Sequence, residues 1–296
     1  MIYNEYQALP SRSREVFAMK KFWKFALPAA GAAAAALGVT AFLTAPGHAP
    51  EEKKAPFRGV NVAHRGLHSR DRAVSENSLP AFRAAVERGY GVEFDVHITL
   101  DGALVVFHDD TLLRMCGVEE RIDDLTLEEV RSHTLADTEE RIPLLSEVLE
   151  VIGGRTPIVL ELKRGRQNAL LCEKTRAALL DYAGDVCIES FDPTIVRWWR
   201  KNAPDVLRGQ LSCPAKAFGS ELKGPAAFAL SRLLTNFLCR PQFIAYGVSG
   251  GRKPLTVRLC EALGAMRVCW TSHSPIHEED NDTVIFEYYR PRKKFK

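Results

Sequence analysis

The sequence contains no pair of cysteines at the C-x-x-C spacing of thiolate metal sites, and its seven cysteines are an odd number. These features exclude a small disulfide scaffold and argue against a thiolate zinc site, so we expect the cysteines to be buried apolar thiols. A formal net charge of only +3 gives no reason to expect binding to nucleic acid. With 46% hydrophobic and 26% charged residues, the composition excludes disordered, collagen-like and coiled-coil classes.

Long uncharged stretches are also scarce, and the main one covers residues 25–44. A helix of about twenty residues crosses the hydrocarbon core of a bilayer, so this stretch predicts a transmembrane helix or uncleaved signal anchor. Lys20, Lys21 and Lys24 precede it and favour a cytoplasmic segment 1–24. The chain is then a single-pass protein of the cell membrane, with a linker at 45–57, an extracellular domain at 58–290 and a basic tail at 291–296.

Two other interpretations of the N-terminus remain open. A cleaved signal peptide is one, with small-residue sites ending at Ala45 and Ala49, although Pro46 and Pro50 directly follow those alanines. A soluble alanine-rich helix is the other. The run Met19-Lys20-Lys21 also resembles the natural start of a signal or anchor sequence, which predicts that residues 1–18 are not translated.

The sequence after residue 57 lacks an internal repeat but alternates short apolar runs with amphipathic stretches. Eight β-like runs cover 60–63, 91–96, 158–162, 186–189, 207–211, 243–246, 267–270 and 283–286. Helical periodicity occurs at 79–88, 169–182, 194–202, 226–238 and 256–263. This alternation predicts an α/β fold, a (β/α)₈ TIM barrel. A doubly wound sheet is the alternative, but no glycine-rich phosphate loop follows the first run.

One connection departs from the alternation. The run 91–99, the turn Leu100-Asp101-Gly102 and the run 103–107 predict a hairpin that returns His108 near the level of Glu93. Residues 111–156 then form a small insertion before the third strand. Barrel active sites lie at the C-terminal ends of strands, so polar residues there are the candidates for function.

Seven such residues occupy the ends of the first strands and of the hairpin. They are His64, Arg65, Glu93, Asp95, His108, Glu161 and Lys163. Three carboxylates suit Mg²⁺ or Ca²⁺, and the i, i+2 spacing of Glu93 and Asp95 places both on one strand face. The arginine and the lysine suit a phosphate, and the two imidazoles suit acid–base chemistry near neutral pH. Together they indicate phosphoester cleavage.

These residues belong to motifs that resemble those of the glycerophosphodiester phosphodiesterase family. The motifs are His64-Arg65-Gly66, Glu76-Asn77-Ser78, Glu93-x-Asp95, Asp101-Gly102, Val105-Val106-x-His108-Asp109 and Glu161-x-Lys163, continued by Ser190-Phe191-Asp192, Tyr246-Gly247 and Val268-Cys269-Trp270-Thr271. The resemblance implies a barrel hydrolase that uses one divalent cation to release glycerol 3-phosphate and an alcohol. It implies that Glu93, Asp95 and Glu161 hold the metal, and that His64 and His108 are the acid–base pair. It further implies that Arg65, Glu76 and Lys163 contact phosphate or glycerol, and that Trp270 lines the pocket.

The last strand departs from the family pattern. Where the family often has Thr-Asp-x-Pro, this chain has Phe286-Glu287-Tyr288-Tyr289-Arg290-Pro291, which leaves the substrate open. A small glycerophosphodiester is the first candidate. A lysolipid, cleaved by a lysophospholipase D or a related phospholipase, is the second, and a catalytically silent, membrane-tethered receptor for glycerol-phosphate polymer is the third. In another interpretation, Glu93 and Asp95 face solvent on an exposed strand. The oligomeric state is not predicted.

Overall fold

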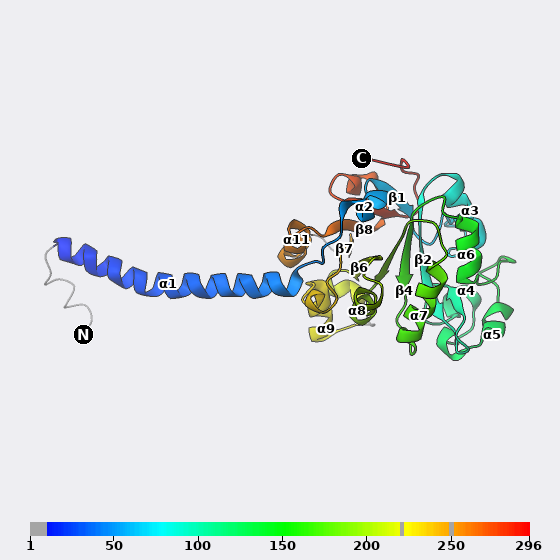
Figure 1. Cartoon of the computed structure of the whole chain (residues 1–296), viewed down its shortest axis with the longest axis horizontal. Coiled ribbons are helices and arrows are strands. Elements are labelled where there is room, and N and C mark those ends of the chain that lie inside the picture. The colour runs from blue at the N-terminus through cyan, green and yellow to red at the C-terminus, as the bar shows by residue number, and fades with distance from the viewer. Residues whose placement is uncertain (1–10, 220–221, 249–251) are drawn as a thin grey trace. The chain divides into compact units, whose positions relative to one another are not determined.

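Eight parallel strands form a closed barrel in the computed structural model, which describes residues 11–219, 222–248 and 252–296. The first strand, β1, pairs with β2 on one side and with β9 on the other, and this double pairing closes the sheet. The barrel strands are β1 (Val60–Ala63), β2 (Gly91–Ile98), β4 (Ile158–Leu162), β5 (Val186–Ser190), β6 (Leu207–Ser212), β7 (Phe243–Gly247), β8 (Met266–Ser272) and β9 (Thr283–Phe286). All eight predicted runs are strands, so the predicted TIM barrel is confirmed (Figure 1).

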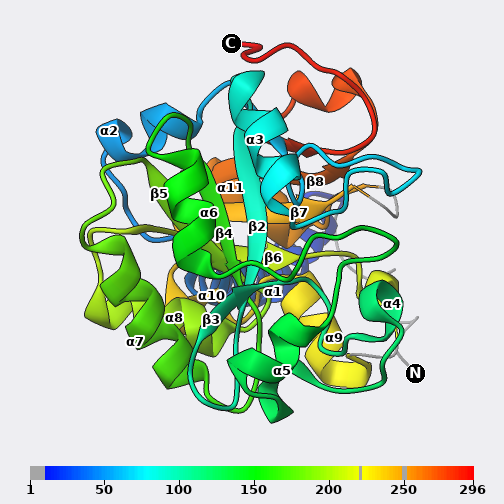
Figure 2. The ribbon, with the colours of Figure 1, turned by 90° about the vertical axis from the view of Figure 1, so that its right-hand side faces the viewer.

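Helices cover the outside of these strands (Figure 2). They are α3 (Leu79–Glu87), α6 (Leu145–Ile152), α7 (Asn168–Leu179), α8 (Pro193–Asn202), α9 (Gly224–Ser231), α10 (Asn236–Cys239) and α11 (Leu255–Ala262). The single helix expected over 226–238 is divided into α9 and α10. Leu233 lies between them with a φ of +57° and is fully buried against Ile244 and Tyr246 of β7. Burying this leucine beneath the turn explains the break.

The predicted hairpin is present, because the short strand β3 (Leu104–Val106) pairs antiparallel with the end of β2. The segment after it contains α4 (Leu113–Cys116), a 3₁₀ turn (Ile122–Asp124) and α5 (Leu127–Ser132), which a capping box at Thr126 begins. Phe107, Leu112 and Ile142 form part of a separate small core. The insertion is therefore a packed unit on the hairpin side of the barrel.

The segments on either side of the barrel domain also contact it. Residues 45–57, expected as a linker, contain α2 (Glu51–Lys54) and a 3₁₀ turn (Ala55–Phe57), and Phe57 packs in the cluster inside the barrel. At the other end, expected as a basic tail, Lys294 forms a β-bridge with Val60, and the Phe295 amide donates to the Gly59 carbonyl. Both segments belong to one compact unit, Thr44–Lys296, because each contributes buried apolar side chains or backbone hydrogen bonds to the barrel.

The other unit is built around α1 (Ser11–Thr44). Its stretch Phe22–Thr44 has a mean hydropathy of 1.8 over the most apolar window, and none of that window is buried. Among the described residues, one helix is therefore long and apolar enough to cross a membrane or to act as a signal sequence. The predicted cytoplasmic segment 1–24 lies partly outside the described residues, which begin at residue 11.

All seven cysteines are free thiols. Six of them are buried, and Cys116 in the insertion is half-buried. The expectation of buried thiols is thus confirmed for six of them.

Candidate active site

Strand β2 places two carboxylates inside the barrel. Glu93 and Asp95 are 2% and 1% exposed, whereas Val92, Phe94 and Val96 between and beside them pack in the outer core beneath the helices. Alternation along a strand requires this division. The interpretation in which Glu93 and Asp95 face solvent is therefore wrong.

The third predicted carboxylate lies on the adjacent strand. Asp95 is in register with Glu161 of β4, and one oxygen each of Glu93, Asp95 and Glu161 lie within 4.8 Å of one another. All three residues are buried. Burial raises the pKa of Glu93 well above its usual value, and the neighbouring Asp95 and Glu161 charges raise it further. Carboxylates packed so closely need positive charge between or beside them.

A further carboxylate was not found from the sequence. Glu189 of β5 is in register with Glu161 and is 1% exposed, and its Oε2 atom has no hydrogen-bond partner among the described residues. Burial raises the pKa of Glu189 well above its usual value, and the negative charges of Glu161 and Asp95 raise it further. The i, i+2 spacing from Phe191, which directly follows β5, was the available sequence signal, since alternation along the chain places both side chains on one face.

Two cations face these acids. The Lys163 ammonium lies 2.9 Å from Glu161 Oε1 and 3.0 Å from Asp95 Oδ1, and the Arg65 Nε atom lies 3.7 Å from Asp95 Oδ2. Burial would raise the pKa of Asp95, but Lys163, His108 and Arg65 outweigh it and hold the pKa well below its usual value. If Glu93, Asp95, Glu161 and Glu189 are all ionised, their four negative charges exceed the two positive charges of Lys163 and Arg65 by two. One divalent cation would balance that difference.

Backbone geometry at the end of β1 fixes Arg65. Its φ is +52°, and its amide donates to Glu93 Oε2 at 2.9 Å, while its guanidinium donates to Glu76 Oε1 at 2.7 Å. The buried Asn77, with a φ of +53°, donates from its side chain to Asp95 Oδ2 at 2.9 Å. Asn77 was seen in the sequence only as part of a motif. The structure shows that it orients a carboxylate.

His64 directly follows β1 and lies beside the carboxylates. Its Nε2 atom is 3.9 Å from Glu93 Oε2, and its Nδ1 atom is 3.4 Å from Glu287 Oε1. Glu287 also accepts from His68 Nε2 at 3.0 Å. Burial lowers the pKa of His64 to about 4, and the adjacent Arg65 charge acts in the same direction. In the sequence, Glu287 stood out only as part of the departure in the last strand, and His68 belonged to none of the motifs.

His108 is held by a chain of charged groups from the insertion. Its Nδ1 atom lies 2.5 Å from Asp109 Oδ1, and Arg114 Nε donates to Asp109 Oδ2 at 2.5 Å. Arg114 also donates to both oxygens of Glu76, at 2.7 and 2.9 Å. Glu76 therefore links the two arginines, Arg65 and Arg114. The hairpin brings His108 close to the metal-binding candidates, because the Phe107 amide donates to the Asp95 carbonyl.

Trp270 is part of an aromatic group around the ends of β5 and β8. Its indole N–H donates to the Ala245 carbonyl at 3.1 Å, and its ring meets Phe191 edge to face at 5.5 Å. Phe191 in turn contacts Phe218 at 6.0 Å. Trp270 is only partly buried.

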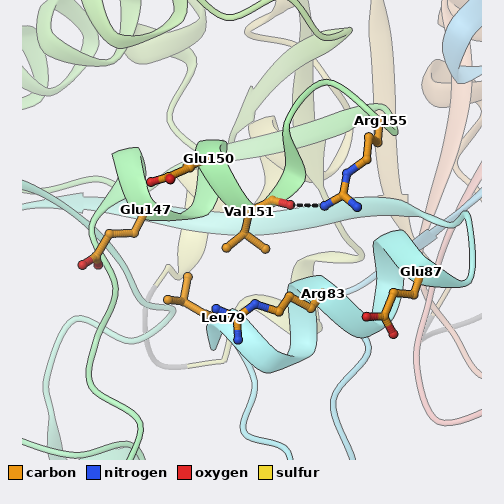
Figure 3. A pocket seen from close by; sticks show the side chains of 7 residues that line it. All are labelled: Leu79, Arg83, Glu87, Glu147, Glu150, Val151 and Arg155. Atoms are coloured by element: carbon orange, nitrogen blue, oxygen red, sulfur yellow. Dashed lines mark hydrogen bonds between the residues drawn. The ribbon is translucent and has the colours of Figure 1, made fainter.

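A separate pocket lies on the outer flank between α3 and α6. Figure 3 shows Leu79 and Val151 facing each other there, with Arg83, Glu147 and Glu150 among the charged residues around them. None of its lining residues is a predicted site residue. The candidate site is therefore the group of residues at the strand ends.

Comparison with protein families and solved structures adds to this geometry. Residues 64–288 match the model of the glycerophosphoryl diester phosphodiesterase family. A curated glycerophosphodiester phosphodiesterase of Caldanaerobacter subterraneus is 37% identical over 161 residues, covering 51% of this chain and 65% of the relative. A lysophospholipase D of Rattus norvegicus is 33% identical over 159 residues, or 49% of each chain. The chain thus spans about half to two thirds of the length of these relatives.

Solved structures share the fold. The structure of an Oleispira antarctica phosphodiesterase in complex with the product sn-glycerol 3-phosphate has a TM-score of 0.63 at 22% identity, covering 77% of this chain and 93% of the other. A putative glycerophosphoryl diester phosphodiesterase from Silicibacter pomeroyi has a TM-score of 0.64 at 22% identity, covering 82% and 92%.

Proposed function

The chain belongs to the glycerophosphoryl diester phosphodiesterase family, and from this premise we propose that it hydrolyses glycerophosphodiesters to glycerol 3-phosphate and an alcohol. The observation that carries the proposal is the buried group of three carboxylates beside a histidine and two cations. Such a group is expensive to bury unless a bound cation balances its negative charge, and the bound cation together with Arg65 and Lys163 would then attract an anionic substrate.

We propose that Glu93, Asp95 and Glu161 hold one divalent cation. The donor set fits, because hard carboxylate oxygens suit Mg²⁺ or Ca²⁺ and because a divalent cation would balance the two negative charges that remain when all four carboxylates ionise beside Lys163 and Arg65. When bound, the cation would draw negative charge from the phosphate. The orphaned Oε2 atom of Glu189 supports the same assignment, since a buried oxygen without a partner requires a cation, a proton or water.

The protein's own residues would supply the rest of the chemistry. Arg65 and Lys163 would hold the phosphate oxygens, with Glu76 keeping the Arg65 guanidinium in place. His64 is the proposed acid, which protonates the leaving alkoxide, and Glu287 accepts from its other nitrogen. His108 is the proposed base, which takes a proton from the nucleophile, either water or a neighbouring glycerol hydroxyl. Asp109 orients its ring. We propose that Trp270 lines the edge of the substrate-binding pocket at the strand ends.

A lysolipid is the second candidate substrate. It is favoured by the similarity to a lysophospholipase D and by the apolar helix Phe22–Thr44. We further propose that this helix is an uncleaved anchor and that the barrel lies outside the cell, because lysines precede the helix. A tethered barrel would meet substrates at the membrane or at the cell wall.

The full chain in mild detergent, supplied with Mg²⁺ or Ca²⁺, tests these proposals. We expect release of glycerol 3-phosphate from glycerophosphocholine, and loss of that release with excess EDTA. The variant His64→Ala should lower kcat about 10²- to 10⁴-fold, the usual contribution of a general acid or base. Glu93→Ala should be comparably inactive and should also lose its response to added metal.

His133→Ala is the matched control, because His133 lies in the insertion and, among the described residues, its side chain makes no hydrogen bond while its backbone amide donates to Val130. This variant should retain full activity. If lysophosphatidylcholine is turned over faster than glycerophosphocholine, a lysolipid is favoured as the substrate. An absence of metal-dependent turnover on either substrate would contradict the enzyme and favour the silent receptor.

A further inference from the structure

A basic pocket lies between α8 and α10, away from the site at the strand ends. It has a volume of about 320 Å³ and is lined by Arg197, Arg200, Lys201, Phe237 and Leu238. The three cationic side chains belong to exposed positions in the last turns of α8, and no lining residue is acidic. The pocket therefore combines positive charge with an apolar wall.

The charges on α8 are not neutralised by neighbouring acids. Within the described part of the chain, Arg197 and Lys201 form no salt bridge, and Arg200 donates only to the Leu238 carbonyl, at 3.2 Å. The nearby Arg208 shows the same excess of positive charge. Burial lowers the pKa of Arg208, and the Arg200 charge lowers it further. An anion bound here would relieve this repulsion.

The position of the pocket relative to the start of the barrel unit suggests the source of the anion. Asn236, the first residue of α10, donates from its side chain to the Thr44 carbonyl at 3.3 Å. Arg240 donates to the Ala45 carbonyl at 3.0 Å, and Thr44 is fully buried. Thr44 is also the last residue of the helix that is apolar enough to cross a membrane. Within the barrel unit, Thr44 is therefore held against α10, so the pocket lies near the residue at which the chain would leave a bilayer.

The chemistry of the lining fits the headgroup of a lipid. Arginine presents a planar fork to two oxygens of a phosphate, and three cations together favour a lipid with net negative charge over a zwitterionic one. Phe237, which is 37% exposed, and the adjacent Leu238 offer apolar surface to the first carbons of an acyl chain.

We propose that the pocket formed by Arg197, Arg200, Lys201, Phe237 and Leu238 binds the phosphate headgroup of an anionic phospholipid from the bilayer that α1 enters. This binding is distinct from catalysis, because none of the five residues belongs to the proposed active site. It would hold the barrel against the membrane surface beside α10.

Native mass spectrometry of the full chain in an uncharged detergent tests this proposal. The probes are phosphatidylglycerol and phosphatidylcholine with the same acyl chains, each added with EDTA and excess sn-glycerol 3-phosphate to occupy the active site. We expect phosphatidylglycerol to be retained preferentially. The triple variant Arg197→Gln, Arg200→Gln, Lys201→Gln should lower that retention at least about tenfold, since each basic residue near an anionic surface contributes to binding.

The matched control removes the same charge elsewhere, with Arg83→Gln, Arg88→Gln and Arg176→Gln on the flank of α3 and α7. Both triple variants should hydrolyse glycerophosphocholine like the parent, which shows that they fold, and the single variant Arg197→Gln provides a milder test. Equal retention of the two lipids would overturn the proposal. So would a loss of bound lipid relative to samples without glycerol 3-phosphate, or an equal loss in the α3 and α7 control.

Discussion

Glu287 is the residue whose role changes most between sequence and structure. It follows the last barrel strand and accepts from both His64 and His68, so it fixes the ring of the proposed acid. The 3.4 Å separation from His64 is long for a hydrogen bond, but such contacts often tighten when substrate binds. Glu287 is therefore a positioning residue for His64.

The variant Glu287→Gln keeps the shape of the side chain and removes its charge. We expect kcat to fall about 10- to 100-fold with little change in KM, because orientation of the imidazole is lost while phosphate contacts remain. Steady-state kinetics on glycerophosphocholine measure both constants. His68→Gln, which removes the other donor, should have a smaller effect, and equal losses in the two variants would contradict a specific link from Glu287 to His64.

The metal-binding candidates that could be predicted from the sequence share one property, because strand spacing decides which face of the sheet they point from. Glu93, Asp95 and Glu161 are examples, because the i, i+2 rule and the strand ends placed them together. Glu189 lies on an interior face for the same reason, but a lone acid in a strand carries no motif. Glu287 and Asn77 depend on loop conformations with tertiary partners, and spacing does not encode such contacts.

At the scale of elements, α3 and β2 form the layer that supports the site. Phe82 of α3 and Phe94 of β2 are fully buried and meet edge to face with ring centroids 5.5 Å apart. Strands and most helices were predictable because their apolar periodicity is regular. The break between α9 and α10 was not, since it depends on the burial of Leu233 beneath a turn.

Phe82→Ala should lower the free energy of unfolding by about 3–5 kcal/mol, the cost of removing a buried aromatic ring and leaving a cavity. Urea titration of the full chain in mild detergent measures the change. Leu180→Ala is the control, because Leu180 is 71% exposed and its substitution should change stability by less than about 0.5 kcal/mol. Similar losses in both variants would contradict the assignment of Phe82 to the core.

The insertion is attached to the barrel through Arg114. Burial would raise the pKa of Glu76, but hydrogen bonds and charge from Arg114 and Arg65 outweigh it and lower the pKa to about 2. A carboxyl whose pKa is lower in the folded state stabilises the protein above its unfolded value of 4.5, and this contribution disappears as the pH falls toward 2.

Arg114→Ala should therefore lower stability by about 1–2 kcal/mol at pH 7, where charged hydrogen bonds to Glu76 and Asp109 are lost. The difference from the parent should shrink as the pH falls from 4.5 toward 2, because the parent loses the same interaction by protonation. Thermal melts across this range measure it. The glutamine of Glu76→Gln cannot ionise, so in this variant the loss of stability that Glu76 protonation causes between pH 4.5 and 2 should be absent. If Arg114→Ala is less stable than the parent by the same amount at every pH, the proposed coupling between Arg114 and Glu76 ionisation is contradicted.

At the scale of the whole molecule, the proposed anchor makes a testable statement about the side of the membrane on which the barrel lies. The cysteines make this measurable, because six of the seven are buried and burial raises the pKa of the half-buried Cys116 thiol to about 11. A thiol-reactive reagent therefore meets little reactive background on the folded chain. Leu180 is 71% exposed on the barrel unit, and Phe22 is 65% exposed at the start of the apolar helix.

An impermeant maleimide applied to intact cells should label Leu180→Cys and leave Phe22→Cys unlabelled until the membrane is opened. In the proposed topology, Lys20, Lys21 and Lys24 would hold the start of the helix in the cytoplasm, so the helix would carry residues 45–296 to the opposite side. The intact mass of the labelled chain reports cleavage in the same experiment, since removal of a signal ending at Ala45 or Ala49 also removes position 22. Labelling of Phe22→Cys alone in intact cells would reverse the orientation, and it would place the proposed substrates in the cytoplasm.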